Sequence, residues 1–172
     1  MNKKIAYGGI LTSLTLLIIY FAGIAPSGKL ALYAISSLPA AFMVIEFGAA
    51  SAAAMFAAGG ILSLLLLGNI PATIPYLIFF GYYSIVKYYI EKVTNASLEI
   101  VLKLLFFNTV LAASYFLYTE VFLLEINTEF TVRGWILAAA LIVLQFVYLL
   151  YDYVFSRIIE YYYNRIRIIR QK

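Results

Sequence analysis

The chain has 172 residues, of which 65% are hydrophobic and 12% are charged, and its mean hydropathy is +0.98. Soluble domains carry about a quarter charged residues, so the composition indicates an all-α membrane protein that crosses the bilayer several times. Cysteine and histidine are absent from the sequence, which excludes disulfides, zinc sites and Cys-His or Ser-His catalysis. We expect no metal and no cofactor, and we interpret the net charge of +4 as membrane topology rather than nucleic-acid binding.

The first apolar run, Ile5 to Ile24, follows Lys3 and Lys4 and has about the 20 residues that a membrane-crossing helix needs. A cleaved secretory signal with Gly23-Ile24-Ala25 as its small-x-small site is the alternative. The length of the run and the five apolar runs that follow favour a span. Within this span, small residues recur four positions apart, as in helices that pack closely in membranes, in the pairs Gly8 with Thr12 and Gly9 with Ser13.

The second run, Leu30 to Ile45, follows a turn that is rich in Pro, Ser and Gly. Pro39 has no N–H for the carbonyl of Ile35, so we expect a kink at that position. Broken backbone inside a membrane is tolerated where a neighbouring helix, a hydroxyl or a cavity satisfies the freed group. The kink is therefore either a packing feature or part of a binding site.

A tight joint at 46–48 precedes a helix, ending near Leu67, whose first residues are nearly all small. We interpret this helix as the central packing element, because its small residues allow neighbouring helices to approach closely. The alternative is a helix that merely tolerates small residues. The two predicted packing faces are Ala49, Ala53 and Ala57, and Ala50, Ala54 and Ala58.

Gly68 to Pro71 interrupts the apolar pattern, and Asn69 is a predicted N-cap for the fourth span, Ala72 to Ile90. Pro75 lies near the start of that span, so we expect it to constrain the entry without breaking the middle. The connection that follows is expected to lie in water and contains Lys87, Glu91, Lys92, Asn95, Glu99 and Lys103.

The fifth and sixth spans are predicted from about Leu104 to Leu124 and from about Trp135 to Phe155. An acidic loop joins them, and residues 156–172 form a basic amphipathic extension that we expect on the inner membrane surface. The loop carries Glu120, Glu125, Asn127, Glu129 and Arg133, and the extension carries Arg157, Arg165, Arg167 and Arg170. The loop acids either attract a cationic solute or only complement the positive charge on the other side.

The basic residues divide unequally between the two sides of a six-span chain. Ten of the 12 fall on one side, and only Lys29 and Arg133 fall on the other. By the positive-inside rule, both termini are cytoplasmic. We therefore predict a single domain, residues 1–172, built as a bundle of six transmembrane helices. Tyrosines fall at the predicted inner boundary, where such rings sit at headgroup depth: Tyr7, Tyr88, Tyr89 and Tyr161 to Tyr163.

Two polar stripes occur on the last two spans, and we expect them to face inward because an unpaired amide in hydrocarbon costs several kcal/mol. Gln145 is predicted near the midplane, where it and Asn108 either join helices or contact a ligand. Asp152 and Glu46 are predicted near the inner boundary, solvated or paired with a base, and a buried proton relay is the alternative. The stripes consist of Asn108, Ala112, Tyr115 and Thr119, and of Ala138, Leu141, Gln145, Tyr148 and Asp152.

The opening, Lys3 to Leu14, and the layout of six short spans with cytoplasmic termini resemble the substrate-binding S component of energy-coupling factor vitamin transporters. The resemblance implies a first-helix surface that docks on a transmembrane T component, here Gly9 with Ser13 or Gly8 with Thr12. It also implies a solute site in the outer half of the bundle. The matching region contains Lys29, Asn69, Tyr76, Tyr115, Thr119 and Gln145.

The expected function is therefore a membrane subunit that binds a small solute such as a vitamin. It would act with a T component and two cytoplasmic ATPases, since the chain has no Gly-rich phosphate loop. A structural or scaffold membrane protein, using the helix from Ala49 and the basic extension to bind proteins and lipid, is the alternative. An enzyme is disfavoured, because no pair of carboxylates has spacing suited to acid–base work and His and Cys are absent.

Overall fold

The computed structural model describes residues 2–117 and 134–167, in which all the regular elements are helical. The predicted all-α class is confirmed for these residues. The chain divides into two compact units, residues 1–94 with 159–172 and residues 95–158. We call the first the larger unit and the second the α7–α8 unit.

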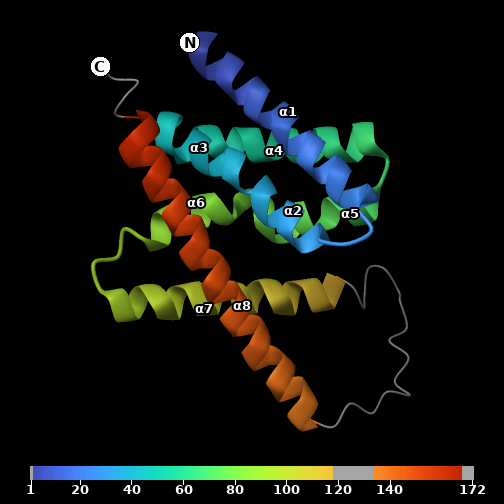
Figure 1. Cartoon of the computed structure of the whole chain (residues 1–172), viewed down its shortest axis with the longest axis vertical. Coiled ribbons are helices and arrows are strands. Elements are labelled where there is room, and N and C mark those ends of the chain that lie inside the picture. Colours follow the sequence, from blue (N-terminus) through green and yellow to red (C-terminus); the bar gives the residue numbers. More distant parts are fainter. Residues whose placement is uncertain (1, 118–133, 168–172) are drawn as a thin grey trace. The chain divides into compact units, whose positions relative to one another are not determined.

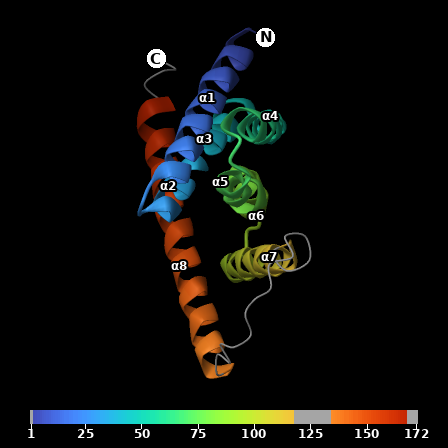
Figure 2. The same cartoon turned by 90° about the vertical axis from the view of Figure 1, so that its right-hand side faces the viewer.

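The larger unit is built around α1, which packs against α2, α3 and α4, while α3 also packs against α4 and α6 (Figures 1 and 2). Its apolar core contains Leu11 from α1, Met43 and Val44 from α3, and Ala52 and Met55 from α4. The elements of the unit are α1 (Asn2–Ile24), α2 (Lys29–Ser36), α3 (Leu38–Phe47), α4 (Ala49–Leu67), α5 (Ile70–Pro75), the π-helical segment η1 (Tyr76–Phe80), α6 (Gly81–Ile90) and, after α8, the π-helical segment η3 (Tyr162–Arg167).

The predicted joints of the larger unit are confirmed at glycines that adopt positive φ. Gly48, with φ of 84°, separates α3 from α4, and Gly68, with φ of 58°, ends α4. Glycine has no Cβ, so it enters these conformations without the steric cost that other residues meet. Asn69 then caps α5 as predicted, because its side-chain oxygen accepts a hydrogen bond from the backbone N–H of Ala72 at 3.1 Å.

The break in the second apolar run lies at Ser37, just before Pro39. Pro39 occupies the first turn of α3, where its missing N–H costs no helical bond. The hydroxyl of Ser84 on α6 donates to the carbonyl of Ser37 at 2.8 Å. This bond fixes α6 against the joint between α2 and α3, at a carbonyl that also accepts the helical hydrogen bond from Ala41.

The predicted fourth span is helical from Ile70 to Ile90, but it changes register in the middle. The α-helix ends at Pro75, and the π-helical segment Tyr76–Phe80 separates it from α6. As expected, Pro75 does not break the helix, although the turn that follows it is π-helical. Because proline cannot donate a backbone hydrogen bond and crowds the preceding turn, the helix continues with a wider turn.

The α7–α8 unit contains α7 (Ala96–Phe116) and most of α8 (Gly134–Tyr161). The prediction that the fifth helix starts at Leu104 is wrong, because Asn95 caps α7 by accepting from the backbone N–H groups of Ser97 and Leu98. Glu99 and Lys103 therefore lie inside the helix. The predicted end at Leu124 and the loop from Glu120 to Arg133 lie outside the described residues.

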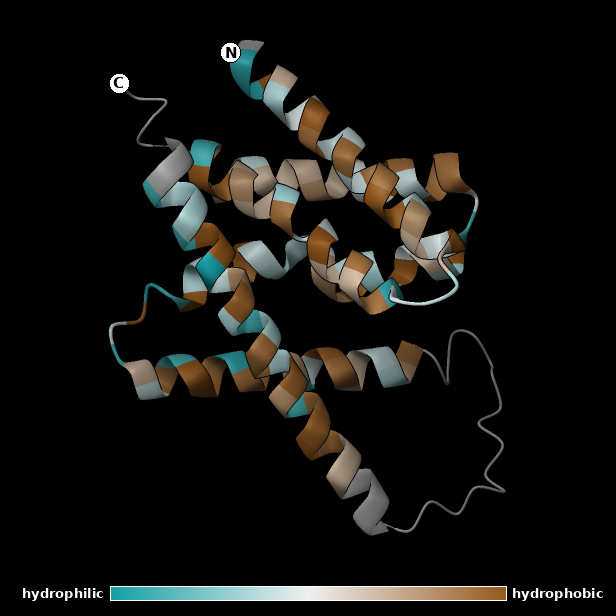
Figure 3. Ribbon diagram, viewed as in Figure 1, coloured by the Kyte–Doolittle hydropathy of each residue, from teal (hydrophilic) through white to brown (hydrophobic). Residues whose placement is uncertain are grey.

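Five helical stretches of the described chain are long and apolar enough to cross a membrane. Figure 3 shows hydrophobic residues along most of the length of α7 and α8, and polar residues at the start of α1. The stretch from α5 to α6 is not among the five, so the six-span count stays a prediction. The five are Lys3–Ile24, Lys29–Phe47, Ala49–Leu67, Ala96–Phe116 and Ala139–Asn164.

Most described Ser and Thr hydroxyls bond to backbone close by in the sequence. Each donates to a backbone carbonyl three or four residues earlier, which satisfies the hydroxyl without water. Such hydroxyls suit a surrounding that offers no hydrogen bonds, as a bilayer core does. The residues with this bond include Thr12, Ser13, Thr15, Ser36, Ser51, Ser63, Thr73, Thr109, Ser114 and Ser156.

Candidate functional site

Two of the predicted solute-binding residues, Asn69 and Tyr76, lie on the same helical stretch of the larger unit. Asn69 is exposed and holds the start of α5, while Tyr76 begins the π-helical segment and is fully buried. Tyr33 of α2 donates its hydroxyl to the carbonyl of Ala72 at 2.7 Å, which fixes α2 against the same stretch. Lys29, the third predicted residue in this unit, lies exposed at the start of α2.

Tyr76 is enclosed by glycines and by one aromatic ring. A Cβ at Gly59 would lie 2.9 Å from the Tyr76 hydroxyl, and a Cβ at Gly81 would lie 2.8 Å from its Cζ. The ring of Phe56 lies 5.7 Å from the Tyr76 ring, centroid to centroid. The absence of side chains at both glycines therefore creates the space that the Tyr76 ring occupies.

The hydroxyl of Tyr76 is buried and has no hydrogen-bond partner among the described residues. Leaving a buried donor unpaired costs about 1–3 kcal/mol, and nearly all buried polar groups of folded proteins are paired. Gln145 of α8, another predicted solute-binding residue, also has a buried side-chain oxygen without a partner in the described chain. Two of the six predicted residues thus carry unpaired polar atoms.

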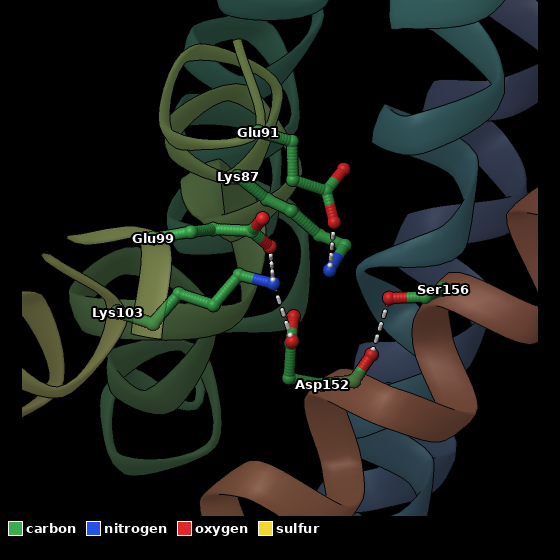
Figure 4. Close-up of polar contacts among 6 residues, drawn as sticks. All are labelled: Lys87, Glu91, Glu99, Lys103, Asp152 and Ser156. Atoms are coloured by element: carbon green, nitrogen blue, oxygen red, sulfur yellow. Dashed lines mark hydrogen bonds and ion pairs between the residues drawn. The ribbon is translucent and has the colours of Figure 1, made fainter. Parts of the chain in front are cut away.

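In the α7–α8 unit, Lys103 forms ion pairs on both sides. Its Nζ lies 2.6 Å from Oε1 of Glu99, one turn earlier on α7, and 2.7 Å from Oδ2 of Asp152 on α8 (Figure 4). Lys103 is 5% exposed and Asp152 is 7% exposed. The prediction that Lys103 lies in water is wrong, because the two carboxylates stabilise its charge inside the unit. Asp152 is paired with a base, which was one of the two predicted environments.

Two further contacts continue this arrangement along α7 and α8. The rings of Phe107 and Tyr148 stack at 4.3 Å with an angle of 4° between their planes. The side-chain amide of Gln145 donates to the side-chain oxygen of Asn108 at 2.8 Å, and Asn108 donates to the carbonyl of Leu104 at 2.7 Å. The two polar stripes therefore meet where Asn108 of α7 contacts Gln145 of α8.

Several other residues of the two stripes are exposed. Tyr115 is 64% exposed, and Leu141 is 50% exposed. Ala112 is exposed as well, so the expectation that the whole stripe on α7 faces inward is wrong. Thr119 lies outside the described residues, and so does the side chain of Ala138.

The predicted packing faces of α4 point outward. Ala53 and Ala57 are exposed, and Ala49 is partly buried. Since the whole helix is apolar, its composition leaves open which face packs. The second predicted face, Ala50, Ala54 and Ala58, is also exposed. The buried face consists of Ser51, Ala52, Met55, Gly59, Gly60 and Ser63.

On α1 the structure separates the two small-residue pairs. Thr12 is buried, and a Cβ at Gly8 would lie 3.4 Å from the Cε of Met43, so this pair faces the core. Gly9 and Ser13 are exposed, and a Cβ at Gly9 would meet nothing within 4 Å. The Gly9 and Ser13 pair is thus the one that is left uncovered on α1.

The end of the described chain packs against its beginning through Tyr162. The Tyr162 hydroxyl lies 3.0 Å from the Tyr7 hydroxyl and donates to Oε1 of Glu46 at 3.1 Å. Its ring stacks on Phe42 at 4.4 Å. Tyr162 is 8% exposed, so its ring packs within the larger unit, and its predicted position at headgroup depth stays a prediction. Arg170 and Lys172 lie outside the described residues.

Lys87 is a second cation that the sequence assigned to water and the structure buries. It lies in the last turn of α6, is 2% exposed, and pairs with Glu91 at 2.7 Å. The long side chain of lysine buries its apolar stem while its ammonium reaches a carboxylate. The i,i+4 spacing of Lys87 and Glu91 is visible in the sequence, as is that of Glu99 and Lys103, and it signals helix rather than loop.

Among the described residues, no group of three or more acidic side chains is arranged to hold a metal ion. Comparisons with protein families, with curated proteins and with solved structures give no match for this chain.

Proposed function

We propose that the chain is a membrane-embedded, substrate-binding subunit of an energy-coupling factor type importer for a small solute such as a vitamin. The observation that carries the proposal is the buried hydroxyl of Tyr76, which has no partner among the described residues. A bound solute with a hydrogen-bond acceptor supplies the missing partner. Such sites are mostly apolar with a few placed polar groups, and Tyr76 lies against the ring of Phe56 and two glycines.

The uncovered small residues support a partner protein in the membrane. Gly9 and Ser13 on α1, and Ala53 and Ala57 on α4, are exposed. The hydroxyl of Ser13 bonds to the carbonyl of Gly9 at 3.0 Å, so this face is small and has no unpaired donor. Small faces of this kind let a second membrane helix approach closely. The proposed partners are a transmembrane T component and, through it, two cytoplasmic ATPases.

The proposed placement has six spans in the cell membrane with both termini in the cytoplasm, and α5 to α6 forms the fourth span. The unequal division of basic residues supports this orientation. Single cysteines at Ser27, Asn69 or Asn127 should react with an impermeant maleimide added outside intact cells, and one at Ser97 should not. Labelling at Ser97 with protection at Asn127 would reverse the orientation.

Native mass spectrometry of the purified chain provides the first test of the function. We expect a retained small molecule and, in gentle extraction, copurified membrane and ATPase subunits. Tyr76→Phe then tests whether the buried hydroxyl of Tyr76 binds the solute. Because it removes an unpaired buried hydroxyl, it should keep or raise thermal stability. It should weaken binding of the solute identified in the wild-type spectrum by about 5-fold to 150-fold. Unchanged affinity would remove Tyr76 from the site.

A scaffold protein is the second proposed function, and the exposed small-residue faces of α4 favour it. It predicts copurified membrane proteins without a small molecule. It also predicts that Ala53→Leu and Ala57→Leu abolish that copurification while the stability of the isolated chain is unchanged. A retained small molecule whose affinity falls in Tyr76→Phe would exclude a purely structural role.

A further inference from the structure

Lys92 follows α6 and lies over two tyrosine rings. Its Nζ is 4.3 Å from the centroid of the Tyr88 ring and 5.0 Å from that of the Tyr89 ring. The two rings lie 5.3 Å apart in an edge-to-face arrangement. Both distances are within the range of about 6 Å over which an aromatic face attracts a cation. The rings therefore hold the ammonium group on the surface of the larger unit.

The environment of Lys92 differs from that of the two buried lysines. Lys87 and Lys103 are neutralised by carboxylates. Lys92 is exposed, and no carboxylate among the described side chains pairs with it. Tyr88 is 40% exposed and Tyr89 is 57% exposed. The group formed by Tyr88, Tyr89 and Lys92 thus presents an uncompensated positive charge on an exposed aromatic platform.

We propose that Tyr88, Tyr89 and Lys92 form a binding site for the headgroup of an anionic phospholipid. Tyrosine rings concentrate at the membrane–water interface because they have an apolar body and a polar tip. A basic residue at that depth attracts an anionic headgroup, and the phenol hydroxyls supply donors for the phosphate oxygens. The single exposed charge gives little affinity for free phosphate, whereas a lipid also places its acyl chains beside the apolar helices.

The same combination of tyrosine and cation recurs on α8. Arg157 lies with its Cζ 5.3 Å from the ring centroid of Tyr153, four residues earlier, and its guanidinium donates to the Tyr153 hydroxyl at 3.3 Å. In both sites the cation follows a tyrosine by four residues, on α8 within one helix and at Lys92 in the turn after α6. The aromatic platform is therefore a repeated means of holding an exposed cation in this chain.

The test is native mass spectrometry of the full chain titrated with phosphatidylglycerol or with phosphatidylcholine in detergent. Lys92→Gln should lower the affinity for the first phosphatidylglycerol by roughly five-fold, the contribution of one basic residue near an anionic surface. Lys92→Arg should retain wild-type affinity, because it keeps both the charge and the stacking on tyrosine. Phosphatidylcholine binding should be the same in all variants.

Two further variants separate a built site from charge alone. Lys4→Gln removes an exposed lysine that has no ring contact among the described residues, so it should have less effect than Lys92→Gln. Replacing both Tyr88 and Tyr89 by Leu should lower phosphatidylglycerol affinity while leaving the charge in place. Equal losses in Lys4→Gln and Lys92→Gln, or full affinity in the tyrosine double variant, would overturn the proposal. Thermal melting of each variant confirms that it is folded.

Discussion

The larger unit and the α7–α8 unit bring apolar helices together by different means. In the larger unit, helices meet at glycines and aromatic rings, and the hydrogen bonds described between elements come from neutral hydroxyls, as in Ser84 to Ser37 and Tyr33 to Ala72. In the α7–α8 unit, a buried ion pair and an amide pair join the helices, at Lys103 with Asp152 and at Asn108 with Gln145.

This difference predicts opposite sensitivities. Close approach at glycines fills the interior of the larger unit with rings, so an added methyl group has no space. The α7–α8 unit depends instead on paired charges, so it is sensitive to the loss of one partner. A buried ion pair is weak evidence for net stability, but breaking it by removing one partner is costly.

Lys103→Met should cause the largest loss. It removes Lys103 from the buried carboxylate of Asp152, and removing one member of a buried pair typically costs about 3–5 kcal/mol. The free energy of unfolding in detergent, followed by circular dichroism during denaturation, provides the measurement. Replacing Lys103 by Met and Asp152 by Leu together should recover most of this loss, because neither member of the pair is then left buried without the other.

Lys4→Met is the matched control for that experiment, since Lys4 is exposed at the start of α1. It should change stability by less than about 0.5 kcal/mol, as surface substitutions usually do. If Lys103→Met and Lys4→Met change the free energy of unfolding equally, the contact between Lys103 and Asp152 does not hold α7 to α8. The α7–α8 unit would then not depend on paired charges.

Gly81→Ala tests the larger unit. The new Cβ would lie 2.6 Å from Cδ2 of Phe56 and 2.8 Å from Cζ of Tyr76. Overpacking of this kind typically costs about 1–3 kcal/mol, which exceeds the roughly 0.5–1 kcal/mol that alanine gains over glycine in a helix. In Gly9→Ala the new Cβ meets nothing within 4 Å. This variant should therefore be more stable by the helix-propensity difference alone. A stability increase in both variants would mean that the contact with Phe56 relaxes without cost.

Tyr162→Phe tests the contact between the two ends of the described chain. The variant keeps the ring that stacks on Phe42 and removes the hydroxyl that reaches Tyr7 and Glu46. A loss of about 1–2 kcal/mol is expected, because one of the partners is a carboxylate. Tyr163→Phe, at a neighbouring exposed position, should have little effect on the melting temperature. Equal melting temperatures would show that stacking alone holds the segment.

The joints of the fold could be predicted because their chemistry is local. Gly48, Gly68 and Asn69 determine where helices end and begin through their own backbone and side-chain preferences. The face on which α4 packs could not be predicted in this way, because the helix is apolar all round and its periodicity selects no face. The buried face became identifiable only from the partners of Ala52 and Gly59.

The candidate site was only partly predictable, for a related reason. The pairing of Lys103 with Asp152 and the packing of Tyr162 on α1 and α3 depend on which residues of distant segments lie opposite each other. A single sequence contains no direct signal for that register. The chemistry of Asn108, Gln145 and Tyr76 was sufficient to select them as polar groups in apolar surroundings, but the sequence could not show that two of them carry unpaired atoms.

Gln145→Leu should have the smallest effect on stability, and it distinguishes solute binding from helix packing. Its amide donates to Asn108 at 2.8 Å, while its side-chain oxygen has no partner in the described chain. Hydrogen bonds between membrane helices contribute about 0.6 kcal/mol on average, so the melting temperature should fall only slightly. If the unpaired oxygen accepts from a solute, affinity for the molecule that copurifies with the wild-type chain should fall by about 5-fold to 150-fold. Asn108→Leu removes the same interhelical bond without removing that oxygen, so it should match the stability change and leave affinity nearly intact. Equal affinity in both variants would assign Gln145 to helix packing alone and leave Tyr76 as the test of the solute site.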